Sequence, residues 1–270
     1  MPKTQNLNRL LSPIDVDRLR EGFENSGPLR HFAIDDFLQP SFFATVSRSY
    51  PTYEAALTQG QSFRAVNESR KVQITDKRNF MPPVQMLNDA LASPEFRELL
   101  SDITGIDSLH SDPQLNGGGM HIMDSGARLD VHVDFNILQE HNLYRRLNLL
   151  VFCSHSWRPE WGGAFELWDP EVEHRLYEAA PLPNRCVVFE TSEESFHGVT
   201  PVKSPRHVSR NSFATYYYTQ ETPEALEGRF HSTVFKARPN EWWRRSVMMP
   251  AERGVKKIED SLRNLRRRSS

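Results

Sequence analysis

The chain has 270 residues, which is long enough for one large domain or two small ones. Hydrophobic residues make up 38% of it and charged residues 25%, the composition of an ordinary water-soluble globular protein. A formal net charge of -2 gives the molecule no overall attraction to nucleic acid or to acidic membranes. We therefore expect neither of them as a partner.

The two cysteines favour a reducing compartment. Cys153 and Cys186 both lie inside apolar runs, which predicts buried free thiols rather than a disulfide framework. The amino-terminal residues lack the apolar core of a signal peptide, and no run approaches the roughly 20 apolar residues of a membrane span. We expect a cytoplasmic protein.

Residues 1–110 carry mainly helix signals. Ser12-Pro13 resembles an N-cap followed by proline at the first helical position, and this helix should end near Gly27. Residues 29–38 are typical of a short strand.

Two further helices are predicted in the same part of the chain. Pro40 opens the first of them, and Ser93-Pro94 caps the second, which should stop at Gly105. We interpret these helices as support for the β-rich segment that follows.

Residues 115–220 predict many short strands separated by turn residues. Asp124-Ser-Gly126 is a turn signal, and Trp161-Gly-Gly163 is another. Apolar or aromatic runs at near-regular spacing favour a barrel or sandwich in an α+β chain, and they cover residues 120–123, 146–154, 164–168, 186–190 and 212–219.

Residues 228–270 form a polar and aromatic extension. Ile258, Leu262 and Leu265 recur at helical spacing, which predicts an amphipathic helix packed on the barrel. Trp242-Trp243 is expected to pack this segment, with a lid or a homodimer contact as alternatives. We interpret residues 1–270 as one domain: helical support (1–110), barrel core (115–220) and this extension.

Three side chains form a candidate metal site. His132 and Asp134 are two residues apart, so in a strand they project from the same face. His197 follows a predicted strand that a barrel can bring alongside them. Two imidazoles and one carboxylate hold one face of a non-haem Fe(II) and leave its other positions open. We therefore assign His132, Asp134 and His197 as metal ligands and catalytic residues.

Arg210 is the candidate anion-binding residue. It opens a strand of aromatic and apolar residues, where a buried guanidinium is costly unless it meets an anion. Ser212 faces the same side and can donate a hydroxyl hydrogen bond to the same carboxylate. Lys203 and Arg206 are rival anion binders in a loop-like stretch. Zinc is the rival metal, but zinc hydrolysis does not need such an arginine.

These residues resemble the Fe(II)/2-oxoglutarate-dependent dioxygenases, particularly the prolyl 4-hydroxylase-like branch. The resemblance covers roughly residues 115–220. It rests on His132-x-Asp134, His197 and Arg210-x-Ser212, and on the strand from Arg145 to Phe152 that precedes Trp161-Gly-Gly163. It implies a double-stranded β-helix, or jelly-roll, core with N-terminal helices and a C-terminal helical segment.

The resemblance also implies the cofactors. The cosubstrate 2-oxoglutarate would chelate Fe(II) and reach Arg210 and Ser212 with its far carboxylate, O₂ would be consumed, and ascorbate would serve as reductant. Asn148, Phe152 and Val199 are expected near the cosubstrate. Phe152 departs from the branch, which often has a tyrosine near this position, so we expect Ser212, Asn148 or a strand tyrosine to compensate.

The expected function is hydroxylation of an unactivated C–H bond with release of succinate and CO₂. The retained carboxylate of Asp134 argues against halogenation, since related halogenases have a small residue there. A peptidyl proline, an amino-acid-like molecule or a natural product fits as substrate. The alternatives are a non-catalytic metal-binding jelly-roll module and a nucleic-acid-binding factor, against which the near-neutral charge argues.

Overall fold

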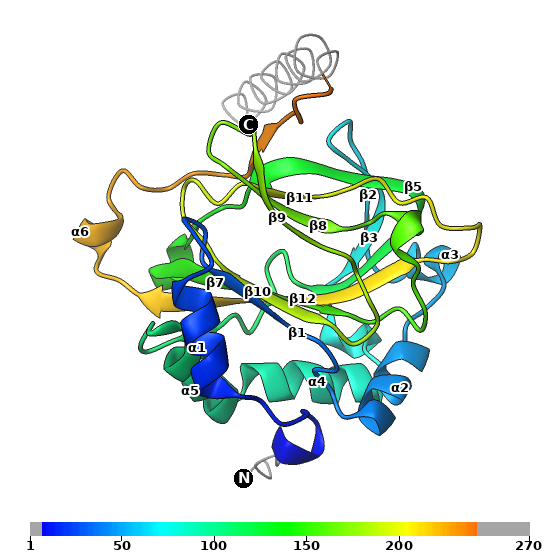
Figure 1. Ribbon diagram of the computed structural model, residues 1–270, viewed down its shortest axis with the longest axis horizontal. Helices are drawn as coiled ribbons and strands as arrows, with labels where there is room; N and C mark the ends of the chain where they lie inside the picture. Colours follow the sequence, from blue (N-terminus) through cyan, green and yellow to red (C-terminus); the bar gives the residue numbers. More distant parts are fainter. Residues whose placement is uncertain (1–6, 242–270) are drawn as a thin grey trace, which may run out of the picture.

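The computed structural model describes residues 7–241, and it shows a curled antiparallel sheet with helices packed on one side (Figure 1). Trp242-Trp243 and the amphipathic helix predicted around Ile258 lie outside the described residues. The helices are α1 (Val16–Glu24), α2 (Pro40–Arg48), α3 (Tyr53–Ala56), α4 (Pro82–Ala92), α5 (Pro94–Thr104) and α6 (Pro223–Leu226). None of the helices in this part of the chain is long and apolar enough to cross a membrane.

Thirteen strands make up the sheet, whose main path runs β1-β10-β7-β12-β5-β11-β8-β9. This is the jelly-roll barrel that the resemblance implied. The strands are β1 (His31–Ile34), β2 (Gln61–Arg64), β3 (Glu68–Ile74), β4 (His110–Ser111), β5 (Gly119–Val133), β6 (Ile137–Leu138), β7 (Leu143–Phe152), β8 (Phe165–Trp168), β9 (Arg175–Ala179), β10 (Cys186–Glu190), β11 (His197–Val199), β12 (Arg210–Gln220) and β13 (Val234–Lys236).

Strand β5 has partners along both of its edges. One edge pairs with β12 and then β11, and the opposite edge pairs with β3 and then β13. Met123 of β5, for example, lies between Arg210 of β12 and Lys71 of β3. Four strands are therefore joined through β5, and residues of all five line one cavity.

Strand β7 is buried on both faces, which explains why its sequence is apolar without a polar alternation. Leu147, Leu149 and Val151 belong to the core beneath the helices, whereas Phe152 belongs to the core inside the barrel. A strand buried on both faces reads as a continuous apolar run. In Figure 1 the helices α1, α4 and α5 lie on the outer side of β1, β10, β7 and β12.

The helix signals were largely confirmed. Helix α5 begins after Ser93, whose hydroxyl accepts the backbone N–H of Phe96, and it ends at Gly105 in the left-handed conformation with φ of 69°. The N-cap predicted at Ser12 was wrong. The N-cap of helix α1 is Asp15, three residues later, whose carboxylate accepts the backbone N–H of Arg18.

The turn predicted at Asp124-Ser-Gly126 was also wrong, since these residues lie within the long strand β5. Gly126 takes a φ of 81° and donates its N–H to Val202, so the strand bends locally and its pairing continues. Helix α4 and strands β2, β3 and β9 were not predicted.

Arg238 joins the segment after β13 to the strands of the barrel. Its buried guanidinium donates to Glu166 of β8 at 2.9 Å and to the backbone oxygens of Val199 and Leu129 at 3.0 and 3.3 Å. Asp130 lies 3.7 Å from the same guanidinium. One side chain thus links β13 to β5, β8 and β11.

We predict that Arg238→Ala lowers the free energy of unfolding by about 3 kcal/mol, because it breaks a buried ion pair and leaves acceptors unmet. Urea denaturation measures the change. Arg229→Ala is the control, since the Arg229–Glu193 pair is about half exposed and its loss should change stability by less than about 1 kcal/mol. Equal midpoints for the two variants would contradict the role of Arg238.

Candidate metal and cosubstrate site

The strand register brings the three predicted ligands together. His132 near the end of β5 lies directly opposite His197 at the start of β11, with ring centroids 4.3 Å apart. Asp134 follows β5 immediately. Its Oδ1 lies 3.3 Å from Nε2 of His132, and its Oδ2 lies 3.5 Å from Nε2 of His197. One ligand atom from each residue fits within 4.8 Å of the others.

Both imidazoles are held in the same way. The Nδ1 atom of His132 lies 2.9 Å from the backbone oxygen of Asp130, and Nδ1 of His197 lies 2.9 Å from that of Ser195. A carbonyl oxygen only accepts, so each Nδ1 carries the proton and each Nε2 keeps its lone pair for a metal. Burial, together with neighbouring His132, lowers the pKa of His197, which favours the neutral ring that a metal requires.

The carboxylate of Asp134 is met from behind by two donors. Arg145 and Asn148, both on β7, donate to its Oδ2 atom at 2.8 and 2.9 Å. Burial opposes ionisation here, but the charge of Arg145 holds the pKa of Asp134 well below its ordinary value. The anionic carboxylate can therefore bind a metal through the less engaged Oδ1 atom.

Arg145 is itself held by aromatic rings. Its guanidinium carbon lies 4.0 Å from the ring centroid of Phe135 and 3.9 Å from that of Tyr216, and its side chain is 1% exposed. Stacking of this kind stabilises a buried guanidinium and fixes its plane. The orientation of Asp134 therefore depends on a rigid support.

Arg210 lies buried at the start of β12 and carries no ion pair with any residue in the described range. Its Nε atom donates to the backbone oxygen of Gly163 at 2.6 Å, and its guanidinium lies 4.9 Å from the ring centroid of Phe152. Burial lowers the pKa of Arg210 to about 9, so it is still a cation at neutral pH. A buried cation of this kind is completed by an anionic ligand.

Gly163 makes room for this arginine. The residue takes a φ of 68°, and a Cβ atom there would lie 2.8 Å from Cδ of Arg210. The glycine pair after Trp161 is thus required both by its backbone conformation and by the close approach of Arg210.

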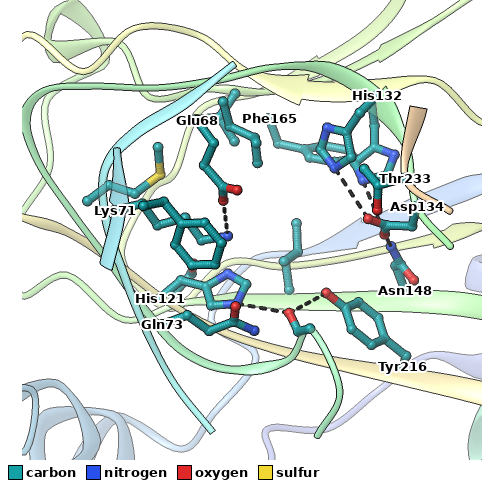
Figure 2. Close-up of a pocket in the computed structure, with 18 of the residues that line it drawn as sticks. Glu68, Lys71, Gln73, His121, His132, Asp134, Asn148, Phe165, Tyr216 and Thr233 are labelled. Carbon is teal, nitrogen blue, oxygen red and sulfur yellow. Dashed lines mark hydrogen bonds and ion pairs between the residues drawn. The ribbon is translucent and has the colours of Figure 1, made fainter. Parts of the chain in front are cut away.

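One cavity of about 210 Å³ contains both the triad and Arg210. Figure 2 shows His132 and Asp134 of the triad on one side of it. Ser212, Asn148 and Val199 line it as well. Ser212 accepts a long hydrogen bond of 3.4 Å from Arg210, whereas Asn148 contacts Asp134. Phe152 lies outside the lining and supports Arg210 from below with its ring.

The rival anion binders lie elsewhere. Lys203 and Arg206 are exposed and do not line the cavity. Of the strand tyrosines, Tyr216 lines it but donates its hydroxyl to the backbone oxygen of Gly117 at 2.7 Å. A hydroxyl group was expected to replace the one that Phe152 lacks. Of the residues considered, Ser212 places its hydroxyl beside Arg210.

Sequence reasoning missed a polar wall across the cavity from the triad. Glu68, Lys71 and Gln73 of β3 line it, and His121 of β5 lies beside them (Figure 2). Burial, followed by the charge of Lys71, lowers the pKa of His121 well below its ordinary value, so this ring is neutral. The polar–apolar alternation of Lys71-Val-Gln-Ile74 was the available signal.

The donor set fits a non-haem Fe(II). Two neutral imidazoles and one carboxylate on one side of an otherwise open cavity leave positions free for other ligands. Zinc accepts the same donors, but Arg210 in the same cavity also calls for an anion, and a 2-oxo dicarboxylate can join the two features.

We predict that Asn148→Leu weakens Fe(II) binding 10- to 100-fold, because Oδ2 of Asp134 loses a donor that orients the carboxylate. An anaerobic competition titration against a chelating dye measures the affinity. Asn211→Leu on neighbouring β12 is the control, since Asn211 does not line the cavity. His132→Ala sets the lower limit of binding. Wild-type affinity in the Asn148 variant would show that Arg145 alone orients Asp134.

Residues 118–218 match the family model of the 2OG-Fe(II) oxygenase superfamily. This range begins just before β5 and ends in β12, so it contains the triad, Arg210 and Ser212. No curated protein matches the sequence.

Solved structures show the same fold at low sequence identity. A prolyl hydroxylase from Trichoplax adhaerens, solved with a peptide fragment of the hypoxia inducible factor oxygen degradation domain, is 17% identical with a TM-score of 0.53. That match covers 79% of this chain and 92% of the other. A prolyl-4-hydroxylase from Pseudomonas putida is 14% identical with a TM-score of 0.54, covering 75% of this chain and 100% of the other. Residues 118–218 therefore resemble the 2OG-Fe(II) oxygenase superfamily, and the fold of the chain is the jelly-roll core seen in prolyl hydroxylases.

Proposed function

We propose that this chain hydroxylates an unactivated C–H bond of an organic substrate, using Fe(II), O₂ and 2-oxoglutarate. The observation that carries the proposal is the single cavity that joins a His-Asp-His cluster to a buried arginine without an ion-pair partner among the described residues. A dicarboxylate that spans the two satisfies both.

Each part of the cavity has a separate task. His132, His197 and Asp134 bind the metal, and Arg145 and Asn148 keep the carboxylate oriented. Arg210 binds the far carboxylate of the cosubstrate, with the hydroxyl of Ser212 beside it. The apolar side chains of Phe165, Phe189 and Val199 exclude water from the space between.

Bound Fe(II) would supply the activation of O₂ that is coupled to oxidative decarboxylation of 2-oxoglutarate. The overall reaction converts substrate, 2-oxoglutarate and O₂ into hydroxylated substrate, succinate and CO₂. One oxygen atom enters the substrate and the other enters succinate. Ascorbate would keep the metal reduced between turnovers.

The substrate classes proposed from the fold are a peptidyl proline, an amino-acid-like molecule and a natural product. The structural relatives are named as prolyl hydroxylases, and one was solved with a peptide fragment. The carboxylate of Asp134 would fill a coordination position on the metal that a halide needs, which favours hydroxylation over halogenation. We propose the cytoplasm as the compartment, in keeping with two buried free thiols.

The deciding experiment separates an enzyme from a metal-binding module without activity. Protein is loaded anaerobically with Fe(II) and then with 2-oxoglutarate, while the weak visible absorption of the chelate is followed. Admission of O₂ should then release succinate. A chelate band without succinate, even with candidate substrates added, would favour the non-catalytic module.

We predict that Arg210→Met weakens 2-oxoglutarate binding about 100-fold, since a charge-assisted pair contributes roughly 3 kcal/mol. The ligand-free variant should unfold at an equal or higher temperature than the wild type, because a buried cation without a partner has been removed. Thermal unfolding with and without 2-oxoglutarate in the presence of Fe(II) measures both effects. A wild-type response to 2-oxoglutarate would exclude Arg210 as the anchor.

A further inference from the structure

Strand β5 forms part of the cavity wall, and the strands that pair with its two edges supply two halves of the lining. One edge of β5 pairs with β11 and β12, which carry His197, Val199, Arg210 and Ser212. A cosubstrate that runs from the triad to Arg210, as proposed above, therefore lies on this half. The opposite edge pairs with β3 and β13, and this second half is left for the substrate.

Among the described residues of β3 and β13, Glu68 and Lys71 are the charged side chains that line the cavity. They are 13% and 8% exposed, and Oε1 of Glu68 lies 2.7 Å from Nζ of Lys71. The ammonium group also lies 5.0 Å from the ring centroid of Phe63. In Figure 2 the pair lies across the open centre of the cavity from His132 and Asp134.

The register places each charge relative to the metal and the cosubstrate anchor. Residues that pair directly across neighbouring strands form a row. Glu68 lies in one row with Leu129 and Val199, close to the row that contains His132 and His197. Lys71 lies in one row with Met123 and Arg210. The anion of the pair therefore lies nearer the triad, and the cation lies nearer the anchor.

A buried ion pair is a weak source of stability, because removing two charges from water offsets most of their attraction. The pair also leaves binding capacity unused. The hydrogen bond between them engages one of three N–H donors of Lys71 and one of several acceptor sites of Glu68. The remaining donors and acceptors can bind a ligand that carries an anion and a cation close together.

We infer that Glu68 and Lys71 bind the α-ammonium and the α-carboxylate of a free amino acid. The ammonium group donates to Glu68, and the carboxylate accepts from Lys71. The amino-acid side chain then extends over Leu129 and Phe235 toward the triad, and these apolar neighbours select an aliphatic side chain. The inference rests on the proposed function and narrows its substrate class.

A residue inside a peptide offers neither charge, since both groups are part of amide bonds. A peptide would leave Glu68 and Lys71 paired only with each other. The buried pair therefore favours a free amino acid over the peptidyl substrate. The products would be a side-chain hydroxylated amino acid, succinate and CO₂.

The first test measures binding to the anaerobic Fe(II)- and 2-oxoglutarate-loaded protein by calorimetry. The probes are L-valine, L-leucine, L-isoleucine, L-methionine and L-proline. For the tightest binder we expect at least a tenfold loss of affinity when its amine is acetylated, and a similar loss when its carboxylate is amidated. Equal binding of the acetylated amide, or no binding by any of the five, would overturn the inference.

Variants assign each charge to its residue. Glu68→Gln should reduce the discrimination against the acetylated amino acid, and Lys71→Met should reduce the discrimination against the amide. The double exchange Glu68→Lys with Lys71→Glu keeps an ion pair but reverses its direction, so it should fold and lose the amino acid. Undiminished binding by this exchange would indicate a purely structural pair.

Two controls keep the outcomes separate. Lys203→Met removes an exposed lysine outside the cavity and should leave amino-acid binding intact. The wild type is also tested for the chelate band and for succinate release. Their absence counts against the proposed function, whereas their presence without amino-acid binding counts against this inference alone.

Discussion

The buried charge of Asp134 constrains the whole site. Its negative charge must be stabilised by donors that leave the space between the carboxylate and the two imidazoles free for a metal. Arg145 and Asn148 satisfy this requirement from strand β7 and contact only one carboxylate oxygen. The guanidinium in turn depends on the rings of Phe135 and Tyr216. The orientation of the Asp134 carboxylate thus depends on Arg145, and the position of Arg145 depends on the two aromatic rings.

Arg210 presents the opposite situation. Its guanidinium is buried on a platform formed by Phe152 and Gly163, and the described structure offers it no carboxylate. Burying such a charge without a partner costs stability, and the proposed binding of a dicarboxylate would offset that cost. The charge of Asp134 is paired with Arg145, whereas Arg210 has no ion-pair partner among the described residues. This difference is expected if a metal needs a fixed ligand and a dicarboxylate needs an unpaired cation.

The sequence predicted the triad and Arg210 because each stands in a short local pattern whose chemistry is unusual. His132-x-Asp134 has strand spacing, and Arg210 interrupts an otherwise aromatic strand. The jelly-roll core was implied by the family resemblance, which rests on the same residues. Glu68 and Lys71 escaped prediction because Glu68-Ser-Arg-Lys71 looks like a solvated charged stretch, and Arg70 with a φ of 53° breaks the alternation that would reveal a strand. The supporting role of Phe152 depends on contacts between strands far apart in sequence, which local patterns do not contain.

The position of β5 within the sheet has a further consequence for the behaviour of the protein in concentrated solution. Its backbone groups are engaged on both sides, so the strand that carries His132 cannot recruit a strand from a neighbouring molecule. The outermost strands of the main path are β1, which is four residues long, and β9, which carries Arg175 and Glu178. Short or charged edge strands of this kind discourage edge-to-edge aggregation. Strand addition from a neighbouring molecule would instead require an outer strand with one unpaired edge, such as β1, β9 or β2.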